Sequence, residues 1–246
     1  MTGIPIEFSE PPKEADYLIA YIDILGTKEY VAKGESKEIF DLIHGSFVMS
    51  TKILPQLELF GFGNLKFKIF SDNILIALKT DKTNIEEAFN LLSKFLKIFL
   101  LLFVMKGTLF RGGISYGKLA IDDIIVWGKG LVDAVFLEER IAIYPRIVLN
   151  TSLVSLLKDF CEKEEFENKY SCVVDDDGCC YYDYIDYKEP VTGKWLKANY
   201  TLINQKLSEE NDPKIVQKYY WHLNYLNHAK DKFNYEWSET SFEIEW

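Results

Sequence analysis

Apolar residues recur along the first 150 residues with two different periods. Continuous or alternating apolar runs bounded by turn residues predict strands, and apolar positions three and four residues apart predict helices. The predicted strands are 17–23, 65–70, 73–79, 108–117 and 147–149. The predicted helices are 35–52, 84–105 and 129–142. Pro145 stops the last of these helices, because proline cannot continue a helix.

The order of these elements predicts the topology of the sheet. Strand, helix, strand, strand, helix, strand is the split βαβ or ferredoxin-like arrangement, βαββαβ, and a further helix and strand follow it. In such a sheet the third strand runs antiparallel beside the first. The end of the first strand and the turn before the third strand should therefore meet. The predicted fold class is α+β, with a core at 17–150.

The remaining residues form a leader and an extension. Residues 1–16 are a polar leader interrupted by prolines, and 151–246 are interpreted as a C-terminal α/β extension packed on the core. The elements expected in the extension are a helix near 151–164, a strand near 170–175, an aromatic edge strand at 181–187 and helices at 195–209 and 213–230. The run Asp175-Asp176-Asp177-Gly178 lacks the other ligands of an EF-hand loop, so a solvated turn is expected there.

Composition limits the classes of partner. The chain has 246 residues, 48% of them hydrophobic, which is enough for a large buried core. A formal net charge of −10 argues against nonspecific binding to nucleic acid or to an anionic membrane. The apolar stretch from Leu91 to Met105 contains Lys94 and Lys97 and is short for a membrane span, so a buried helix is expected.

Cysteine usage and the N-terminal residues favour a cytoplasmic location. The four cysteines lie close together in the last third of the chain, where neighbours in sequence make a poor disulfide framework. Reduced thiols are therefore expected. The leader has neither the basic start nor the apolar centre of a targeting signal.

Two aspartates stand at the ends of strand-like apolar runs. Asp23 ends the first run, and Asp72 lies in the turn between the second and third strands. Desolvating an unpaired carboxylate is unfavourable, so two of them at one edge of a sheet favour a cation between them. Magnesium or manganese suits such oxygen ligands. The alternative is that Asp23 caps the next segment and Asp72 occupies an ordinary turn.

Four segments, taken together, resemble class III nucleotide cyclases. Tyr21–Gly26 is similar to the first metal-binding motif of that family, and Phe70–Asp72 is similar to the second. Arg111–Gly117 resembles the strand after the second helix, and Val126–Glu138 resembles the helix that follows. The resemblance implies two divalent cations, Mn²⁺ or Mg²⁺. Their implied ligands are Asp23, Ile24 and Asp72, of which the two aspartates are also catalytic.

The same resemblance implies substrate-binding positions. Lys68 keeps the type of the family's second base-reading residue, and Arg111 is a candidate contact to phosphate. Ile125 stands where the family has an aspartate that reads adenine, and Val132 and Phe136 stand where it has asparagine and arginine. An apolar group cannot accept a hydrogen bond from the amino group of adenine. Ordinary adenylate cyclase activity is therefore not expected.

A divergent branch is more similar: the pyrimidine cyclases of bacterial antiphage defence (Pycsar), which make cyclic UMP or cyclic CMP. The shared features are the Asp-Ile-Leu-Gly start, the Phe-Ser-Asp turn, the Arg-Gly-Gly-Ile strand, and an Asp-Gly followed by an aromatic run that ends at 184–187. This resemblance implies a nucleoside triphosphate substrate, a homodimer with composite sites and a separate effector protein activated by the cyclic product. Neither a nucleic acid nor a membrane partner is expected.

Three functions remain open from the sequence. The leading one is a cyclase that converts UTP or CTP to the 3′,5′-cyclic nucleotide and pyrophosphate. UTP is favoured, since Lys68 can donate to a uracil carbonyl. The others are a purine cyclase and a catalytically dead module that binds a nucleotide or only dimerises. Both aspartates and Lys68 are retained, which speaks against a dead site.

Two further expectations concern apolar residues near the third helix. The bulk of Trp127 and Phe136 near the entry of that helix should leave room for a single ring. Apolar residues beyond the fourth strand should form an exposed surface for the homodimer. These residues include Tyr116, Ile121, Ile124 and Ile125.

Overall fold

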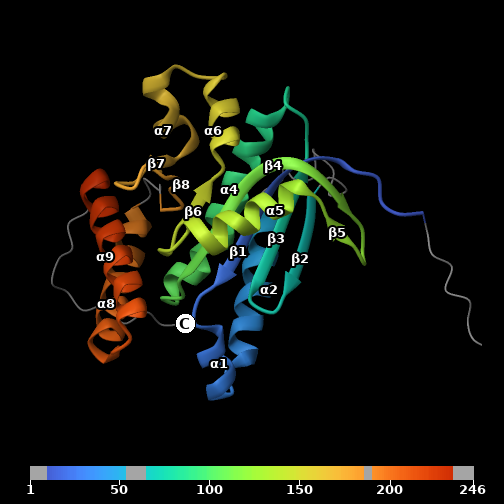
Figure 1. The fold of residues 1–246 in the computed structure, drawn as a ribbon. Helices are drawn as coiled ribbons and strands as arrows, with labels where there is room; N and C mark the ends of the chain where they lie inside the picture. The colour runs from blue at the N-terminus through green and yellow to red at the C-terminus, as the bar shows by residue number, and fades with distance from the viewer. Residues whose placement is uncertain (1–9, 54–64, 186–189, 235–246) are drawn as a thin grey trace, which may run out of the picture.

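The computed structural model describes residues 10–53, 65–185 and 190–234 (Figure 1). Its strands are β1 Ala15–Ile24, β2 Leu65–Phe70, β3 Asn73–Lys79, β4 Phe110–Ile121, β5 Val126–Trp127, β6 Ile147–Leu149, β7 Cys172–Val174 and β8 Cys180–Tyr182. Its α-helices are α1 Thr27–Lys33, α2 Ser36–Ile53, α4 Ile85–Met105, α5 Lys129–Phe136, α6 Thr151–Lys158, α7 Phe166–Tyr170, α8 Pro190–Glu209 and α9 Pro213–Phe233. A π-helical turn at Leu137–Ile141 continues α5, and a 3₁₀ turn at Lys163–Glu165 precedes α7.

The strands of the described residues form one mixed sheet that confirms the predicted topology. Its order is β2-β3-β1-β4-β6-β8-β7, and β5 pairs with β4 alone. β1 is antiparallel to both β3 and β4, and β3 is antiparallel to β2, as in a split βαβ sheet. β6 then lies parallel to β4. The α+β fold class is therefore confirmed.

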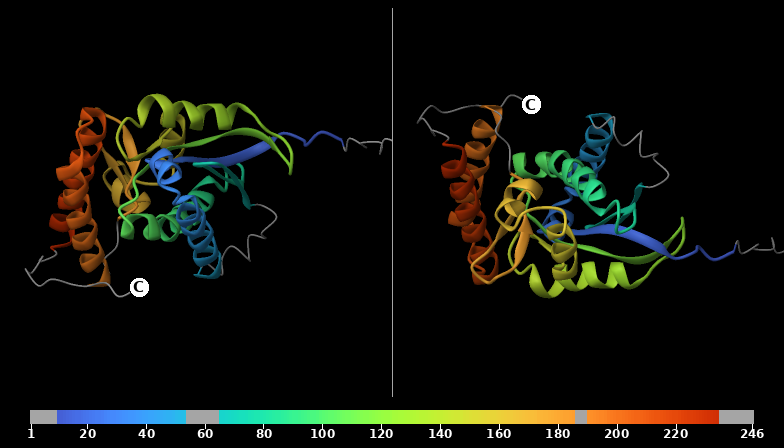
Figure 2. Two further views of the ribbon diagram at one scale, coloured as in Figure 1. Left: turned by 90° about the horizontal axis from the view of Figure 1, so that it is seen from below. Right: turned by 90° about the horizontal axis from the view of Figure 1, so that it is seen from above.

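Different helices cover the two faces of the sheet. Figure 2 shows α2 and α4 on one face and α5 on the other, with α8 and α9 at one end. Alternate residues of β1 divide between the faces: Leu18 and Ile22 join the large core with α2 and α4, and Tyr17 and Ile19 join the smaller core under α5. Asp23 lies four residues after Ile19 on the same strand, so its side chain lies on the same face, the one that carries α5.

The most apolar helix is α4, which forms the centre of the large core. Within the described part of the chain, this helix has the length and hydropathy of a membrane span. More than half of its most apolar window, 56%, is buried inside the molecule. Phe89, Phe95 and Phe99 are fully buried against the sheet and neighbouring helices. The predicted buried helix is confirmed.

Glycines let α5 approach the sheet closely. A Cβ atom on Gly113 of β4 would lie 2.4 Å from the carbonyl oxygen of Ala134 and 2.5 Å from Cβ of Leu137. One on Gly130 of α5 would lie 2.5 Å from Cδ1 of Ile19. The Ser115 hydroxyl donates to the carbonyl oxygen of Gly130 at 2.6 Å. This approach brings the turn that follows α5 against the start of β4.

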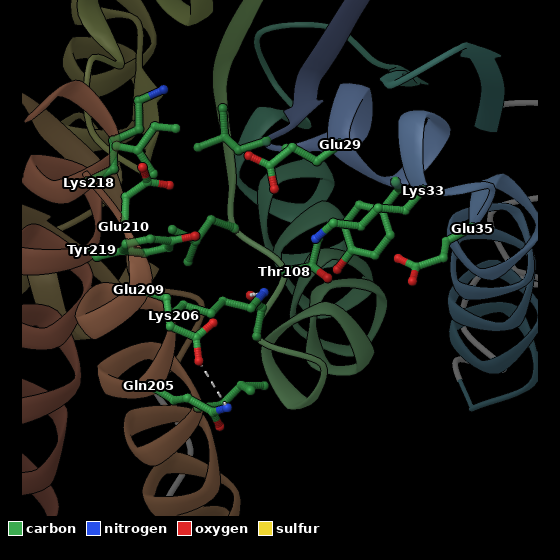
Figure 3. Close-up of a pocket in the computed structure, with 17 residues that line it drawn as sticks. Glu29, Lys33, Glu35, Thr108, Gln205, Lys206, Glu209, Glu210, Lys218 and Tyr219 are labelled. Carbon is green, nitrogen blue, oxygen red and sulfur yellow. Dashed lines mark hydrogen bonds between the residues drawn. The ribbon is translucent and has the colours of Figure 1, made fainter. Parts of the chain in front are cut away.

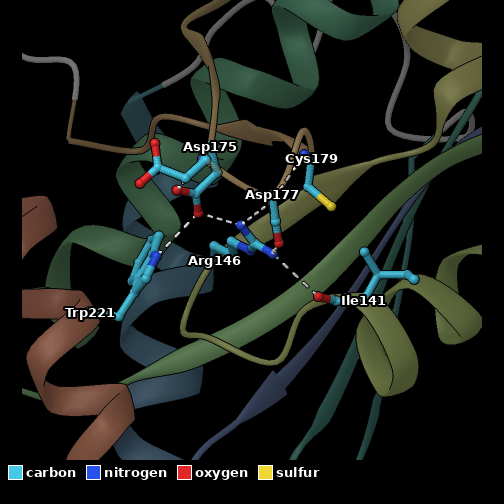
Figure 4. A network of polar contacts seen from close by, with 7 residues as sticks. Ile141, Arg146, Asp175, Asp177, Cys179 and Trp221 are labelled. Carbon is cyan, nitrogen blue, oxygen red and sulfur yellow. Dashed lines mark hydrogen bonds and ion pairs between the residues drawn. The ribbon is translucent and has the colours of Figure 1, made fainter.

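The acidic turn between β7 and β8 is solvated, as expected, and it also contacts a buried arginine (Figure 4). Arg146 is fully buried and forms ion pairs with Asp175 and Asp177, and the Trp221 indole donates to Asp175 at 3.2 Å. Residues 176–178 are exposed, as expected of a solvated turn, but the contact with Arg146 was not predicted. A buried guanidinium needs anionic partners, and these two aspartates supply them. The guanidinium also holds the pKa of Asp177 at about 2.

Buried polar contacts attach α8 and α9 to the rest of the fold. The Tyr225 hydroxyl donates to Asp183 at 2.6 Å, and Lys232 donates to the same carboxylate at 3.0 Å. His222 contacts the side-chain oxygen of Asn199 at 2.8 Å, and burial lowers the pKa of that imidazole to about 3. β8 and β7 continue the core sheet, and the proposed division of the chain at residue 150 stays a prediction.

Several predicted boundaries in the second half of the chain were wrong. The aromatic strand is Cys180–Tyr182 and lies between β6 and β7, so it is not an edge strand. Its predicted end at 186–187, the first nine residues of the leader and residues 235–246 lie outside the described residues. The helix predicted at 151–164 ends at Lys158. The helix predicted at 129–142 is π-helical after Phe136. The sequence analysis missed α1, β5 and α7. The cysteines are free, as expected.

The close packing of α5 generates a stability prediction. Gly113→Ala is expected to destabilise the fold by about 1–3 kcal/mol or more, because the added methyl group meets main-chain atoms that cannot move independently. Gly45→Ala is the matched control, since its Cβ would meet only Cδ1 of Leu102 at 3.8 Å and alanine favours a helix. Urea denaturation measures both variants. Equal stability of the two would contradict this account of the packing.

Candidate functional site

Asp23 and Asp72 lie side by side at one end of the sheet. Asp23 pairs with Asn73 of β3 and with Arg111 of β4. The main-chain N–H of Ile24 donates to the carbonyl oxygen of Asp72 at 3.0 Å. The two aspartates come together because β3 follows the tight β2–β3 turn and runs antiparallel beside β1, as its position in the chain predicted.

Local backbone turns hold the two carboxylates in place. Gly26 has φ +85°, in the left-handed region that favours glycine, and this residue ends β1 and opens α1. The hydroxyl of Thr27, the first residue of α1, donates to Asp72 at 2.6 Å. Ser71 has φ +62° in the β2–β3 turn, and the Asn73 amide donates to Asp72 at 3.3 Å. The Asp72 carboxylate is therefore tied to the segment that follows Asp23.

Arg111 joins Asp23 to a third carboxylate. Its Nε donates to Oδ2 of Asp23 at 3.1 Å, and its Nη2 lies 2.7 Å from Oε1 of Glu138. The second contact is an ion pair without the alignment of a hydrogen bond. Glu138 lies in the π-helical turn after α5, and its side chain is only 4% exposed. One guanidinium thus serves acids from two different elements.

The acids of this cluster outweigh the charge of Arg111. Burial raises the pKa of Asp23, Arg111 opposes the rise, and the charge of Asp72 adds to it. Burial raises the pKa of Glu138 to about 7, again against Arg111 and with the charge of Asp23 adding to the rise. The cluster of Asp23, Asp72, Glu138 and Arg111, termed here the acidic cluster, therefore carries more negative than positive charge.

The oxygens of the acidic cluster fit a hard divalent cation. Asp23 and Asp72 offer carboxylate oxygens, and Ile24 can add only its main-chain carbonyl, because its side chain is buried in the large core on the other face. No group of three or more acidic, histidine or cysteine side chains in the described residues has the arrangement of a metal site. The candidate set is thus two side chains and one carbonyl, and Arg111 holds one oxygen of Asp23.

Lys68 contacts the β4–β5 turn, which also holds Ile125. The Lys68 ammonium donates to the carbonyl oxygen of Asp123 at 3.2 Å and lies 3.8 Å from its carboxylate. Ile125 is 45% exposed and belongs to the same β4–β5 turn, two residues further along. Lys68 shares a sheet face with Asp23 but stands two strands away, which is about 10 Å.

The expectation for Trp127 and Phe136 was wrong. Trp127 precedes α5 and Phe136 is the last residue of that helix, so the two lie at opposite ends, about 12 Å apart at 1.5 Å per residue. They cannot crowd the same helix entry within one chain. Both side chains are exposed, as is that of Val132, one turn before Phe136.

The sequence analysis missed three residues of this region. Glu138 was quoted only as the end of a motif, although an acid directly after the buried Ala134 and Leu137 signals a partner. Thr27 belongs to the helix that was not predicted. Lys218 of α9 comes close enough for its charge to act on both Asp23 and Arg111. No local signal identifies Lys218, because its place depends on how α9 packs.

Comparison with known proteins gives only distant structural similarity. No protein-family model and no curated protein matches the chain. Two solved structures of a bacterial light-regulated adenylyl cyclase are similar, both at 14% sequence identity. The match to the first has a TM-score of 0.43 and covers 79% of this chain and 60% of that chain. The other has a TM-score of 0.42 and covers 62% of this chain and 47% of that chain.

A third similar structure is a class III adenylyl cyclase-like ATP-binding protein from Pseudomonas aeruginosa. It is 12% identical with a TM-score of 0.39, and the match covers 62% of this chain and 37% of that chain. The chain therefore spans less than two thirds of each of these proteins. At such identities and TM-scores the similarity decides nothing about activity, which rests on the residues of the chain itself.

The burial of Glu138 generates a pH-dependent stability prediction. Its pKa in the folded protein is about 7, above the ordinary 4.5, so folding stability is lost as the pH rises from about 4.5 to 7. Glu138→Gln removes this penalty. The variant is expected to be more stable than the wild type at pH 8, on the order of 1–3 kcal/mol, with a smaller difference at pH 5. Urea denaturation at both pH values tests this, and a variant equally destabilised at both would contradict it.

Proposed function

We propose that this chain is a nucleotide cyclase that acts on a pyrimidine nucleoside triphosphate. The observation that carries the proposal is the meeting of Asp23 and Asp72 at one sheet end, in a cluster with excess negative charge. The resemblance of four segments to class III cyclases, and to the Pycsar branch among them, supports it. The product would be a 3′,5′-cyclic nucleotide that activates a separate effector in antiviral defence.

The reaction is an intramolecular phosphoryl transfer. The bond between the ribose 3′-oxygen and the α-phosphorus forms, the bond from that phosphorus to the pyrophosphate oxygen breaks, and the hydroxyl proton leaves to solvent. A divalent cation held by Asp23, Asp72 and the Ile24 carbonyl would favour loss of that proton and neutralise phosphate charge.

Arg111 supplies a positive group from the chain itself. Its guanidinium can exchange the Asp23 oxygen for a phosphate oxygen, which suits its planar pair of donors. Glu138 holds the other side of the guanidinium during this exchange, so Arg111 stays at the site. Glu138 is therefore a positioning residue for Arg111.

Base selection is assigned to the β4–β5 turn. Ile125 offers no acceptor to the amino group of a purine, and Lys68 can donate to a pyrimidine carbonyl. The oxygens of Asp123 beside Lys68 add an acceptor that suits the amino group of cytosine. Both pyrimidines therefore remain candidates, with UTP favoured by the lysine alone.

A homodimer is proposed on an apolar surface that differs from the expected one. Ile121 is only 7% exposed and is not available, and Tyr116 is half-buried against the large core. The exposed apolar side chains near α5 are Ile124, Ile125, Trp127, Val132 and Phe136. Such a set at the β4–β5 turn and on the outer side of α5 favours contact with a second copy.

A specific contact also favours the catalytically dead alternative. Arg111 already neutralises one oxygen of Asp23, as in a site that needs no cation. A module of this kind would bind a nucleotide without turning it over. Arg111 offsets the charge of only one acid. The negative charge left on the other acids of the cluster favours a bound cation, and therefore the enzyme.

Replacing either aspartate is expected to abolish turnover without unfolding the chain. Asp23→Asn and Asp72→Asn each remove a proposed cation ligand, and relief of their mutual repulsion should leave the melting temperature at or above that of the wild type. Asp16→Asn, at the other end of β1 and paired with Lys118, is the matched control with full activity. Cyclic nucleotide formation with Mn²⁺ measures turnover. Wild-type rates in either site variant would remove the mechanism.

Competition among the four triphosphates at equal concentrations tests base selection. Cyclic UMP or cyclic CMP is expected to exceed the cyclic purines by about 100-fold or more, because a site without an acceptor leaves the purine amino group unpaired. Dominant cyclic AMP or cyclic GMP would refute the pyrimidine assignment. Dominant cyclic CMP would refute only the preference attributed to Lys68.

Sedimentation measurements test the dimer. Trp127→Glu places a charge in the apolar surface and is expected to weaken self-association at least tenfold and lower activity in parallel. Tyr220→Glu is the matched control, since Tyr220 of α9 is similarly exposed but lies outside that surface. A monomeric and fully active wild-type protein would contradict the proposal.

A further inference from the structure

Lys218 of α9 stands beside the acidic cluster, although it comes from the far end of the chain. It lines a cavity of about 580 Å³ together with Leu25 and Gly26, which directly follow Asp23 and Ile24. Figure 3 shows Lys218 at one end of this cavity, with its ammonium pointing away from Gln205 and Glu209 at the other end. The lysine thus lies where the cavity meets the end of β1.

The ammonium of Lys218 has no hydrogen bond or ion pair among the described residues. Lys218 is half-buried, and the charges that act on it are those of one cation, Arg111, and of three acids, Asp23, Asp212 and Glu138. Burial lowers the pKa of Lys218, and the charge of Arg111 lowers it further. A half-buried ammonium that has no partner of its own is stabilised by an anionic oxygen that accepts a hydrogen bond from it.

We propose that Lys218 binds the terminal phosphates of the nucleotide substrate, so that α9 completes the active site. The inference rests on the proposed function, and it names the chemistry of the ligand as a polyphosphate. Asp23 and Asp72, through their cation, would act at the α-phosphate. Lys218 belongs to α9, an element outside the predicted catalytic core.

The acids of the cavity limit how far the phosphates extend. Four glutamates line it, Glu29, Glu35, Glu209 and Glu210, and they repel a polyanion. Lys206 also lines the cavity, but its ammonium donates to the carbonyl oxygen of Gly107 at 2.9 Å. The phosphates are therefore expected beside the Lys218 ammonium and not deeper in the cavity, where Glu35 and Glu209 lie.

Binding of inorganic tripolyphosphate in the presence of Mg²⁺ tests the inference without turnover. Lys218→Gln is expected to raise the dissociation constant about ten- to a hundredfold, the loss of one charge-assisted hydrogen bond. Lys214→Gln, an exposed lysine one turn earlier on α9, makes the same charge change and should stay within twofold of the wild type. Lys218→Arg should restore most of the affinity. Calorimetry gives the constants, and melting temperatures show that each variant is folded.

Two outcomes would overturn the inference: tripolyphosphate affinity of Lys218→Gln within twofold of the wild type, or no binding to the wild type at all. Turnover separates this failure from that of the proposed function. If cyclic product forms and Lys218→Gln binds normally, only the role of Lys218 fails. If no cyclic product forms but binding depends on Lys218, the lysine is a phosphate-binding residue and the cyclase assignment fails.

Discussion

The guanidinium of Arg111 is the contact on which the candidate site depends. It touches Asp23 at the end of β1 and Glu138 in the turn after α5, so it links the sheet to the helix that covers it. This link requires α5 to lie very close to β4. Gly113 and Gly130 provide that closeness, since any side chain there would meet the opposite backbone or side chains. Small residues in the sequence thus set the position of a charged centre.

The charge balance of this centre indicates what it lacks. Asp23 and Glu138 both have raised pKa values although Arg111 contacts each of them, because burial and the other acids oppose ionisation. A site of this kind is stabilised by additional positive charge. A divalent cation between Asp23 and Asp72 would supply it and would release Arg111 toward a phosphate. The carboxylates that repel one another in the free site are thus the same groups that would hold the cation in the proposed reaction.

Much of the core could be predicted from the sequence, because its signals are local. The apolar periods located β2 and β3 to the residue, and the order of elements placed Asp23 beside Asp72. The second half was predicted less well. The aromatic run around Tyr182 was predicted to be an edge strand. The sequence does not show that β7 pairs with the free side of this strand and so becomes the edge of the sheet. The partners of Arg146 are 29 and 31 residues away, which periodicity cannot detect.

The site was predictable only in part, for a similar reason. Asp23, Asp72 and Arg111 lie on neighbouring strands whose pairing follows from topology. Lys68 contacts the β4–β5 turn that holds Ile125, and it stands two strands from Asp23. Lys218 reaches the cluster only through the packing of α9. Residues of this last kind are found from coordinates and not from patterns.

Direct binding of Mn²⁺ tests the central claim, that Asp23 and Asp72 together hold a divalent cation. The electron paramagnetic resonance signal of free Mn²⁺ reports binding without any turnover, in the wild type and in a double variant that carries Asp23→Asn and Asp72→Asn. The account predicts that the wild-type protein, with a nucleoside triphosphate present, removes Mn²⁺ from solution beyond the amount bound by the nucleotide alone, and that the double variant does not. Equal Mn²⁺ binding by the two proteins would contradict it.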